Sequence, residues 1–439
     1  MQNQLKNLAK HLRPTDLRGV AQLATQATKG VATMAEGVHQ SVWGTMGVSS
    51  AKTAKNKAPQ TGGLTGLIYK SVRGITSLVG QGLDASLAKL EPLFALADAA
   101  APQSHEREAV LAALNGVLGD TLAATQNPLA TPMTLRCQGR VLVSASPKAG
   151  KAPTVAADTQ AFAAIQNVSG KIAVLIHGLC MNDLQWAVPH DSAVFDHGAL
   201  LSEALGYTPV YVRYNTGLHT SQNGHAFSKQ LDAMVKNWPV PVTEITVLCH
   251  SMGGLVTRSA VHSAQQSGAG WLAHLKNIVF LGTPHHGAPL ERACNWVDIL
   301  LGSTPYSRPF AKLGQIRSSG ITDLRYGHVL DADWEGQDRF RRKPDSRTPV
   351  PLPAGVACYT VAATTAAKRG SLADRLLGDG LVPLASALGQ HEESARSLVF
   401  AKPNQLIAYR TNHMQLLGSQ EVGQQLLKGL RNYKDTILG

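Results

Sequence analysis

The sequence predicts an α/β protein with a mostly parallel central sheet flanked by helices. Aliphatic runs recur along residues 130–409, and stretches with helical spacing lie between them. The runs at 171–178 and 245–248 consist mostly of aliphatic and β-branched residues, which is typical of parallel strands buried on both faces. Because such strands alternate with helices, we expect right-handed crossovers that join them into one sheet.

The predicted elements follow one another in a regular order. A helix is expected over 106–122, because apolar residues recur there at helical spacing. Two short strands should then open the sheet, and the later strands should alternate with helices. The predicted strands are 135–138, 141–144, 171–178, 209–214, 245–248, 278–281, 357–363 and 406–409, and the predicted helices among them are 227–238, 254–264 and 415–427.

The first part of the chain differs from the rest in its charge. Residues 1–80 contain ten Lys and Arg residues against Asp16 and Glu36, so they hold +8 of the formal charge of +12. We expect a basic helical or flexible leader over 1–63 and a helical N-terminal extension over 64–128, which begins with an amphipathic helix.

This basic arm has two interpretations. It either packs as a helical arm on the rest of the protein, or residues 1–80 make peripheral contact with an anionic membrane or lipid surface. Nucleic acid is disfavoured as a partner, because no aromatic residues are interleaved with the basic ones and no nucleic-acid motif occurs.

Two features favour a cytoplasmic protein. The sequence has neither an 18-residue apolar span nor the apolar core of a secretory signal, so no transmembrane helix is expected. Its five cysteines are scattered without a paired spacing, which indicates free thiols in a reducing compartment.

Residues 245–254 have the form of a nucleophile elbow. The strand-like run is followed by Cys-His-Ser-Met-Gly-Gly, in which Ser251 is the candidate nucleophile. The turn doubles back sharply, so the residues two before and two after the serine must be small. Cys249 and Gly253 occupy these positions, where the G-x-S-x-G pattern has two glycines. A serine that merely caps a helix is the alternative interpretation.

Two backbone N–H groups are candidates for an oxyanion hole. One belongs to Met252, directly after the candidate nucleophile, and the other to Leu179, directly after His177 and Gly178. Gly178 would allow a close approach of the loop. We expect His177 to fix this loop by a hydrogen bond rather than to act in catalysis. The residues that follow should order the loop first and contact substrate second: Asn182, Asp183 and Trp186.

An orienting acid and a base are expected after the nucleophile. Asp379 lies between two glycines on a loop after the predicted strand 357–363, and His413 follows the strand 406–409. The chain order is therefore nucleophile, acid, base. The rival candidates lie in polar or basic loops or too early in the chain: Asp374, His391, His285 and His286. The adjacent histidines lack companion ligands at metal spacing, so no metal is expected.

Several motifs together resemble the α/β-hydrolase superfamily. They are His177-Gly178, Cys-His-Ser-Met-Gly-Gly (249–254), Leu-Gly-Thr-Pro-His-His-Gly-Ala-Pro (281–289), Asp379-Gly380 and Asn412-His413. Within the superfamily, the chain resembles bacterial triacylglycerol-lipase-like esterases and the GPI inositol-deacylase-like group. The resemblance covers about residues 130–439 and implies an α/β-hydrolase domain over 129–439. It does not fix the substrate, because this fold hosts many chemistries.

Helical and strand periodicity fail between about residues 290 and 353. Several large apolar residues are mixed there with prolines and the basic run 341–343. We interpret the segment as a cap or lid that lines an apolar acyl pocket, with a plain surface loop as the alternative.

The resemblance implies a serine hydrolase of the lipase or esterase type, with Ser251, Asp379 and His413 as a catalytic triad. It would cleave carboxylic esters of small or lipid-like molecules through an acyl-enzyme, without metal or organic cofactor. Two alternatives stay open. An acyltransferase or thioesterase would use the same triad, and a non-catalytic protein could bind a lipid surface through the same fold.

Overall fold

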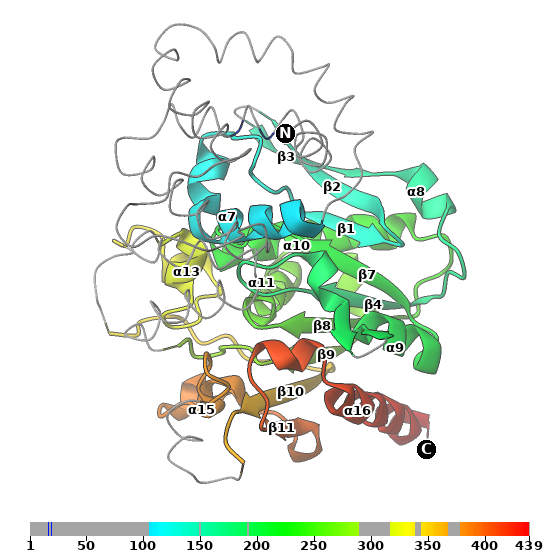
Figure 1. Ribbon diagram of the computed structural model, residues 1–439, viewed down its shortest axis with the longest axis vertical. Helices are drawn as coiled ribbons and strands as arrows, with labels where there is room; N and C mark the ends of the chain where they lie inside the picture. The colour runs from blue at the N-terminus through cyan, green and yellow to red at the C-terminus, as the bar shows by residue number, and fades with distance from the viewer. Residues whose placement is uncertain are drawn as a thin grey trace, which may run out of the picture. The chain divides into compact units, whose positions relative to one another are not determined.

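One sheet of nine strands runs through the described part of the chain in the computed structural model (Figure 1). The structure describes residues 16, 19, 105–148, 151–190, 193–288, 317–338, 344–367 and 378–438. The basic leader and the amphipathic helix predicted before residue 105 lie outside the described residues, apart from Asp16 and Gly19.

The strands, in chain order, are β1 (Thr134–Cys137), β2 (Arg140–Lys148), β3 (Lys151–Ala157), β4 (Lys171–Ile176), β5 (Val188–His190), β6 (Ala193–Phe195), β7 (Thr208–Arg213), β8 (Glu244–His250), β9 (Leu275–Leu281), β10 (Ala357–Thr364) and β11 (Gln405–Tyr409). The α-helices are α7 (His105–Ala124), α8 (Thr159–Ala163), α9 (His197–Leu205), α10 (Thr220–Asn237), α11 (Met252–Ser267), α13 (Ser319–Asp323), α15 (Leu384–Ala387) and α16 (Gln420–Leu438). Short 3₁₀ turns are η2 (Asp183–Trp186), η3 (Gly270–His274), η5 (Asp331–Asp333), η6 (Ser394–Arg396), η7 (Lys402–Asn404) and η8 (Met414–Leu417).

The sheet is parallel except at one edge. Its strand order is β11-β10-β9-β8-β4-β7-β1-β2-β3, and β5 and β6 form a separate hairpin. The strands from β11 to β7 pair in parallel, whereas β1 pairs antiparallel with both β7 and β2, and β2 pairs antiparallel with β3. The predicted α/β class with a mostly parallel sheet flanked by helices is therefore confirmed.

Side chains of the central strands alternate between two apolar layers. In β4, Ile172, Val174 and Ile176 belong to the layer that also contains side chains of α10 and α11. Ala173 and Leu175 belong to the opposite layer, together with side chains of α9 and α16. A strand covered on both faces has no solvent-facing position, which explains why the run is continuously apolar. None of the helices in the described residues is long and apolar enough to cross a membrane.

The chain divides into two compact units, residues 1–131 with 294–318 and residues 132–293 with 319–439, and the sheet belongs to the second. The first unit contains α7, where the sequence predicted a helix. Asn115 on this helix donates to the carbonyl of Leu129 at 2.8 Å and accepts the N–H of Thr131 at 2.8 Å. These bonds hold the segment after the helix back against it.

Two elements at the start of the sheet region differ from the prediction. Strand β3 was not predicted, because Pro153 and a weak apolar alternation make its sequence look like a loop. A proline is tolerated there because β3 is an edge strand. Helix α10 begins at Thr220 rather than at residue 227. Its first turns contain Gly224, where a Cβ would collide with Ser259 of α11, so close helix packing outweighs low helix propensity.

The C-terminal helix also differs from the prediction. The run expected over 415–427 divides at Gly418 into η8 and α16. A Cβ on Gly418 would lie 2.8 Å from Val188 Cγ1, so the glycine permits close contact with β5.

An ion-pair cluster joins the loop after β4 to two strands of the sheet. The Asp183 carboxylate lies 3.2 Å from Arg136 Nε of β1 and also pairs with the Arg213 guanidinium of β7. The three side chains are between 6% and 11% exposed, so the charges are largely removed from water. The predicted loop-ordering role of Asp183 is confirmed.

We predict that Asp183→Asn lowers the free energy of unfolding by about 3–5 kcal/mol, because two buried guanidinium groups lose their carboxylate. Asp232→Asn is the matched control, since its partner Lys236 is 71% exposed, and it should cost at most about 1 kcal/mol. Urea denaturation measures both values. Equal effects of the two substitutions would show that the cluster around Asp183 does not hold the loop.

Candidate active site

The predicted site residues all follow strands of the parallel part of the sheet. Ser251 follows β8, the Gly178–Leu179 segment follows β4, Asp379 lies after β10 and His413 lies after β11. The carboxyl ends of parallel strands meet at one edge of a sheet, which is where α/β proteins bind ligands.

Ser251 occupies a strained turn between β8 and α11. Its φ is 55° and its ψ is −126°, a backbone conformation that non-glycine residues rarely adopt. Two hydrogen bonds hold the turn. The Ser251 N–H donates to Leu281 O at the end of β9 at 2.8 Å, and the Gly254 N–H donates to Ser251 O at 3.0 Å. The predicted strand–turn–helix geometry of the elbow is present.

The small residues around Ser251 allow close backbone contact. A Cβ on Gly253 would lie 2.6 Å from Ile176 O and 2.7 Å from His177 O, so only glycine fits against the end of β4. A Cβ on Gly178 would lie 2.9 Å from Ser251 Cβ, which places the loop after β4 directly against the candidate nucleophile.

Cys249 fills the other small position without any sign of reactivity. The residue is fully buried, and its Sγ donates a hydrogen bond to Val279 O at 3.2 Å. Burial raises the pKa of this thiol well above its ordinary value, so the sulfur stays protonated and packs as a small core side chain. All four described cysteines are free and buried, and Cys294 lies outside the described residues.

Asp379 and His413 form a buried hydrogen-bonded pair. His413 Nδ1 lies 2.6 Å from Asp379 Oδ2, and the His413 N–H donates to Asp379 O at 3.1 Å. The second carboxylate oxygen, Oδ1, accepts the N–H groups of Leu381 at 2.9 Å and Val382 at 2.7 Å. The loop of Asp379 therefore fixes this side chain through Oδ1, and the other oxygen, Oδ2, orients the His413 ring.

The hydroxyl of Ser251 and the Nε2 atom of His413 both lack a hydrogen bond in the described part of the chain. Both atoms are buried, and neither has a hydrogen-bond partner among the described residues. Gly282 places the ring beside the elbow, since a Cβ there would lie 3.1 Å from His413 Nδ1, and Gly282 directly follows Leu281, which bonds the Ser251 N–H. In sites of this kind the bond between nucleophile and base often forms only with substrate present.

Each of the two predicted oxyanion donors belongs to a residue close to Ser251. Met252 is the first residue of α11, where the backbone N–H has no carbonyl one turn earlier to bond. Leu179 is fully buried in the loop that contacts Ser251 through Gly178. This arrangement places both residues next to the candidate nucleophile.

The loop after β4 is held by its own side chains. His177 Nδ1 lies 2.9 Å from Gly178 O, and the His177 ring stacks on Tyr214 with centroids 4.4 Å apart. Burial lowers the pKa of His177 to about 4, so the ring is neutral at physiological pH. Asn182 caps η2 by accepting the Leu184 N–H at 2.9 Å. The predicted loop-fixing roles of His177 and Asn182 are confirmed.

The rival histidines contact other parts of the molecule. His285 is fully buried against Phe280, and its carbonyl oxygen accepts a hydrogen bond from Arg347 Nη1 at 2.9 Å. His286 Nδ1 accepts from Arg347 Nη2 at 2.8 Å, and His391 lies 3.8 Å from Asp345. In the described part of the chain, no group of three or more His, Cys, Asp or Glu residues could hold a metal ion.

Part of the predicted cap segment packs beside the elbow. The Gly320 N–H in α13 donates to Gly217 O at 3.0 Å, and a Cβ on Gly320 would lie 3.1 Å from Met252 Cε. Residues of the segment that were expected to line an acyl pocket lie outside the described residues: Trp296, Leu300, Leu301, Tyr306 and Phe310.

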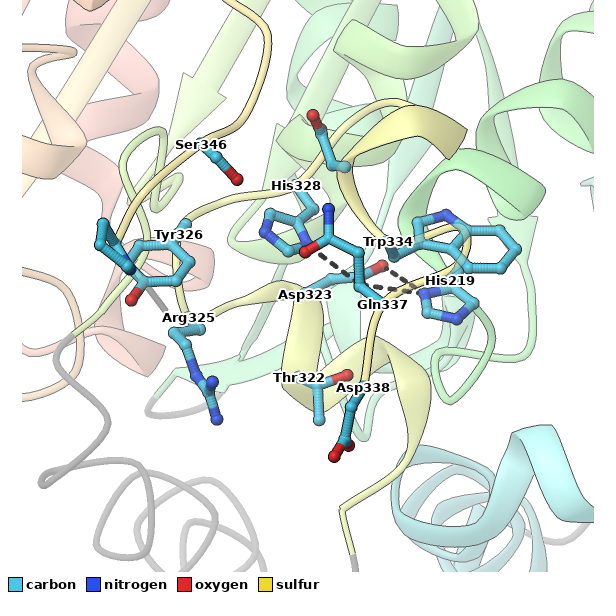
Figure 2. A pocket seen from close by; sticks show the side chains of 12 residues that line it. His219, Thr322, Asp323, Arg325, Tyr326, His328, Trp334, Gln337, Asp338 and Ser346 are labelled. Carbon is cyan, nitrogen blue, oxygen red and sulfur yellow. Dashed lines mark hydrogen bonds and ion pairs between the residues drawn. The ribbon is translucent and has the colours of Figure 1, made fainter. Parts of the chain in front are cut away.

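A polar cluster attaches this segment to the start of α10 (Figure 2). The Asp323 carboxylate is 3.0 Å from His219 Nδ1 and 3.5 Å from His328 Nδ1, and it accepts the Thr220 N–H at 2.7 Å. The Trp334 indole stacks on the His219 ring with centroids 3.7 Å apart. Burial by itself raises the pKa of Asp323, but hydrogen bonds and charge from the two imidazoles outweigh burial and lower it.

The same cluster lines a cavity of about 110 Å³ (Figure 2). His219, Asp323, His328 and Trp334 all contribute to its wall, whereas neither the candidate nucleophile nor His413 does. The sequence did not point to this cluster, because His219 is 104 residues from Asp323 and the members share no motif.

A second chain of hydroxyl, imidazole and carboxylate groups connects α11, α10 and η5. His225 Nδ1 is 2.9 Å from Ser263 Oγ, and His225 Nε2 is 2.8 Å from Asp331 Oδ2. Ser263 lies within a regular helix, and the His225 and Asp331 side chains are 42% and 38% exposed. Without a strained turn or adjacent N–H donors, this chain lacks the parts that activate a serine.

Comparison with known proteins gives a partial family match and distant structural likenesses. Residues 144–323 match a family described as "Domain of unknown function (DUF7379)". No curated protein sequence matches the chain.

Three of the similar solved structures are enzymes or enzyme domains. The mature form of Bacillus licheniformis lipase BlEst2 has 18% identity and a TM-score of 0.35, over 58% of this chain and 91% of that one. The Pyrococcus furiosus esterase Pf2001 has 13% identity and a TM-score of 0.36, over 70% and 91%. The NocB thioesterase domain, in covalent complex with a fluorophosphonate nocardicin G analog, has 11% identity and a TM-score of 0.33, over 61% and 95%. The identities are low, and the chemistry of this site follows from its own geometry.

We predict that Gly253→Ala abolishes turnover and lowers the free energy of unfolding by about 1–3 kcal/mol, because the new methyl group would push the end of β4 away from the elbow. Gly270→Ala is the control, since a Cβ there would meet only Asp232 Oδ1 at 3.5 Å. Thermal denaturation and an ester-hydrolysis assay check both variants. Wild-type stability and turnover in Gly253→Ala would contradict the close contact.

Proposed function

We propose that the protein is a serine hydrolase that cleaves carboxylic esters. The observation that carries this proposal is the bond between Asp379 and His413 beside the strained turn of Ser251. Mere binding of a lipid surface requires neither a strained serine nor a buried imidazole–carboxylate pair, so the non-catalytic alternative is disfavoured.

In the proposed acylation step, His413 Nε2 takes the proton of the Ser251 hydroxyl as its oxygen attacks the ester carbonyl. Asp379 keeps the proton of His413 on Nδ1, so that Nε2 is free to accept. The N–H groups of Leu179 and Met252 stabilise the negative charge that develops on the carbonyl oxygen. His413 then donates the proton to the leaving alcohol, and the acyl group remains on Ser251.

In the proposed deacylation step, His413 Nε2 takes a proton from water as the water oxygen attacks the acyl carbon. The bond between that carbon and Ser251 Oγ then breaks, His413 returns the proton to Ser251 Oγ, and the acid is released. An acyltransferase would use the same groups, but an alcohol or another acceptor would take the acyl group in place of water. A thioesterase would also use them, but its substrate would be a thioester in place of an ester. Assays with water alone, with an added alcohol and with an acyl thioester substrate separate these alternatives by their products.

The finer proposal concerns the substrate class. Lipase-like or inositol-deacylase-like esters are suggested by the sequence motifs, and α13 beside Met252 supports a cap over the site. Contact of residues 1–80 with an anionic membrane or lipid surface remains a prediction, as those residues lie outside the described chain apart from Asp16 and Gly19. Hydrolysis of esters of graded chain length, beside a lysophospholipid, tests the substrate class.

We predict that a fluorophosphonate probe labels the protein once, at Ser251, because only an activated serine reacts with it. Ser251→Ala should abolish both labelling and ester hydrolysis. Ser263→Ala is the matched control, since Ser263 also bonds a histidine that is paired with an aspartate, and it should retain both activities. Peptide mass spectrometry locates the label, and release of p-nitrophenol measures turnover.

Two results would overturn the proposal. One is a label on Ser263 or on any residue other than Ser251. The other is wild-type turnover in the Ser251→Ala variant, because among the described residues no other serine has the positive φ of the elbow.

A further inference from the structure

We propose that His250 is a positioning residue that holds the loop of His413 in register with the nucleophile. The inference rests on the proposed function and adds a residue to its machinery. His250 does not reach the reacting atoms, because its ring bonds the backbone of His413 rather than its imidazole.

The first support is a hydrogen bond across the sheet edge. His250 is fully buried at the end of β8, and its Nε2 lies 3.1 Å from the carbonyl oxygen of His413. The two residues are 163 positions apart in the chain, and β9 and β10 lie between their strands in the sheet. This bond therefore joins the strand that ends in Ser251 directly to the loop that carries the base.

The second support is the space that the His250 ring fills. The ring centroid lies 4.7 Å from that of His413. A Cβ on Gly178 would lie 3.1 Å from His250 Nδ1, so the other side of the ring faces the loop of the oxyanion donors. The His250 imidazole thus contacts the loop of His413 on one side and the loop of Gly178 on the other. His250 also directly precedes Ser251 in the sequence.

The bond also fixes the protonation of the ring. A carbonyl oxygen only accepts, so His250 Nε2 carries the hydrogen, and the buried Nδ1 is left as an acceptor that has no partner in the described residues. Burial lowers the pKa of His250 well below 6.5, and the neighbouring His413, His177 and His197 lower it further when they carry charge. His250 is therefore neutral at physiological pH.

A neutral ring suits the proposed chemistry. His413 becomes positively charged during proton transfer, and a second charge 4.7 Å away would oppose it. His250 provides a hydrogen-bond donor to the loop without adding a charge. A lysine or arginine would provide the donor and the unfavourable charge together.

Two neutral substitutions separate the hydrogen bond from polarity and packing. The amide nitrogen of Gln lies four bonds from Cα, as His Nε2 does, whereas that of Asn lies three bonds away, as Nδ1 does. His250→Gln should keep the bond to His413 O and retain turnover within about threefold of wild type. His250→Asn should lose on the order of 10- to 100-fold in kcat with KM within about threefold, because the base is misplaced.

A second readout does not depend on activity. In the full-length protein, the proton between Asp379 and His413 should give a low-field ¹H NMR signal, and its titration reports the pKa of His413. We expect the signal to persist in wild type and His250→Gln and to broaden or vanish in His250→Asn, while thermal denaturation shows similar stability for the two variants.

Two outcomes would overturn the inference. One is wild-type turnover and an unchanged low-field signal in His250→Asn. The other is an equal loss in both variants that follows a fall in thermal stability, which would mean that the ring only fills space. If wild type hydrolyses no ester or thioester but the contrast in the low-field signal remains, the proposed function fails and the positioning role stands.

Discussion

The arrangement of the whole site depends on the backbone turn at Ser251. A non-glycine residue at a φ of 55° costs roughly 1–3 kcal/mol, and the surroundings must hold it there. Leu281 O accepts the Ser251 N–H, and Gly253 lets the elbow sit against the carbonyl groups that end β4. The strain therefore has a structural consequence. It keeps the serine at the junction of three strand ends, where the loop after β4 and the loop of His413 can both reach it.

The same edge of the sheet contains several buried imidazoles that differ in their roles. Burial lowers the pKa of His177, of His250 and of His285, so these rings serve as neutral hydrogen-bonding or packing groups. His413 alone among them bonds a carboxylate, which can stabilise a positive charge on its ring. Histidine thus has two roles at this edge: neutral rings that bond or pack, and the proposed base. The partner that each ring contacts determines its role.

Local sequence patterns predicted the central strands and the candidate site residues. Contacts between distant segments could not be predicted in this way. The sequence predicts these features because each depends on a short stretch of residues: the apolar runs of β4 and β8, the elbow at Ser251, and the motifs that contain Asp379 and His413. Strand β3 could not be read, since an edge strand needs no continuous apolar run. Two contacts join segments more than a hundred residues apart: the bond from His250 to His413 and the stacking of Trp334 on His219. No local sequence pattern predicts either contact.

The central claim is that one sheet edge brings together nucleophile, base and oxyanion donors, and a crystal structure of the protein with a phosphonate bound to Ser251 tests it most directly. The phosphonate mimics the tetrahedral intermediate of acyl transfer. We predict one phosphonyl oxygen within hydrogen-bond distance of the Leu179 and Met252 N–H groups, with His413 Nε2 beside Ser251 Oγ. A phosphonyl oxygen that faces away from both N–H groups, or a His413 ring turned away from the serine, would contradict it.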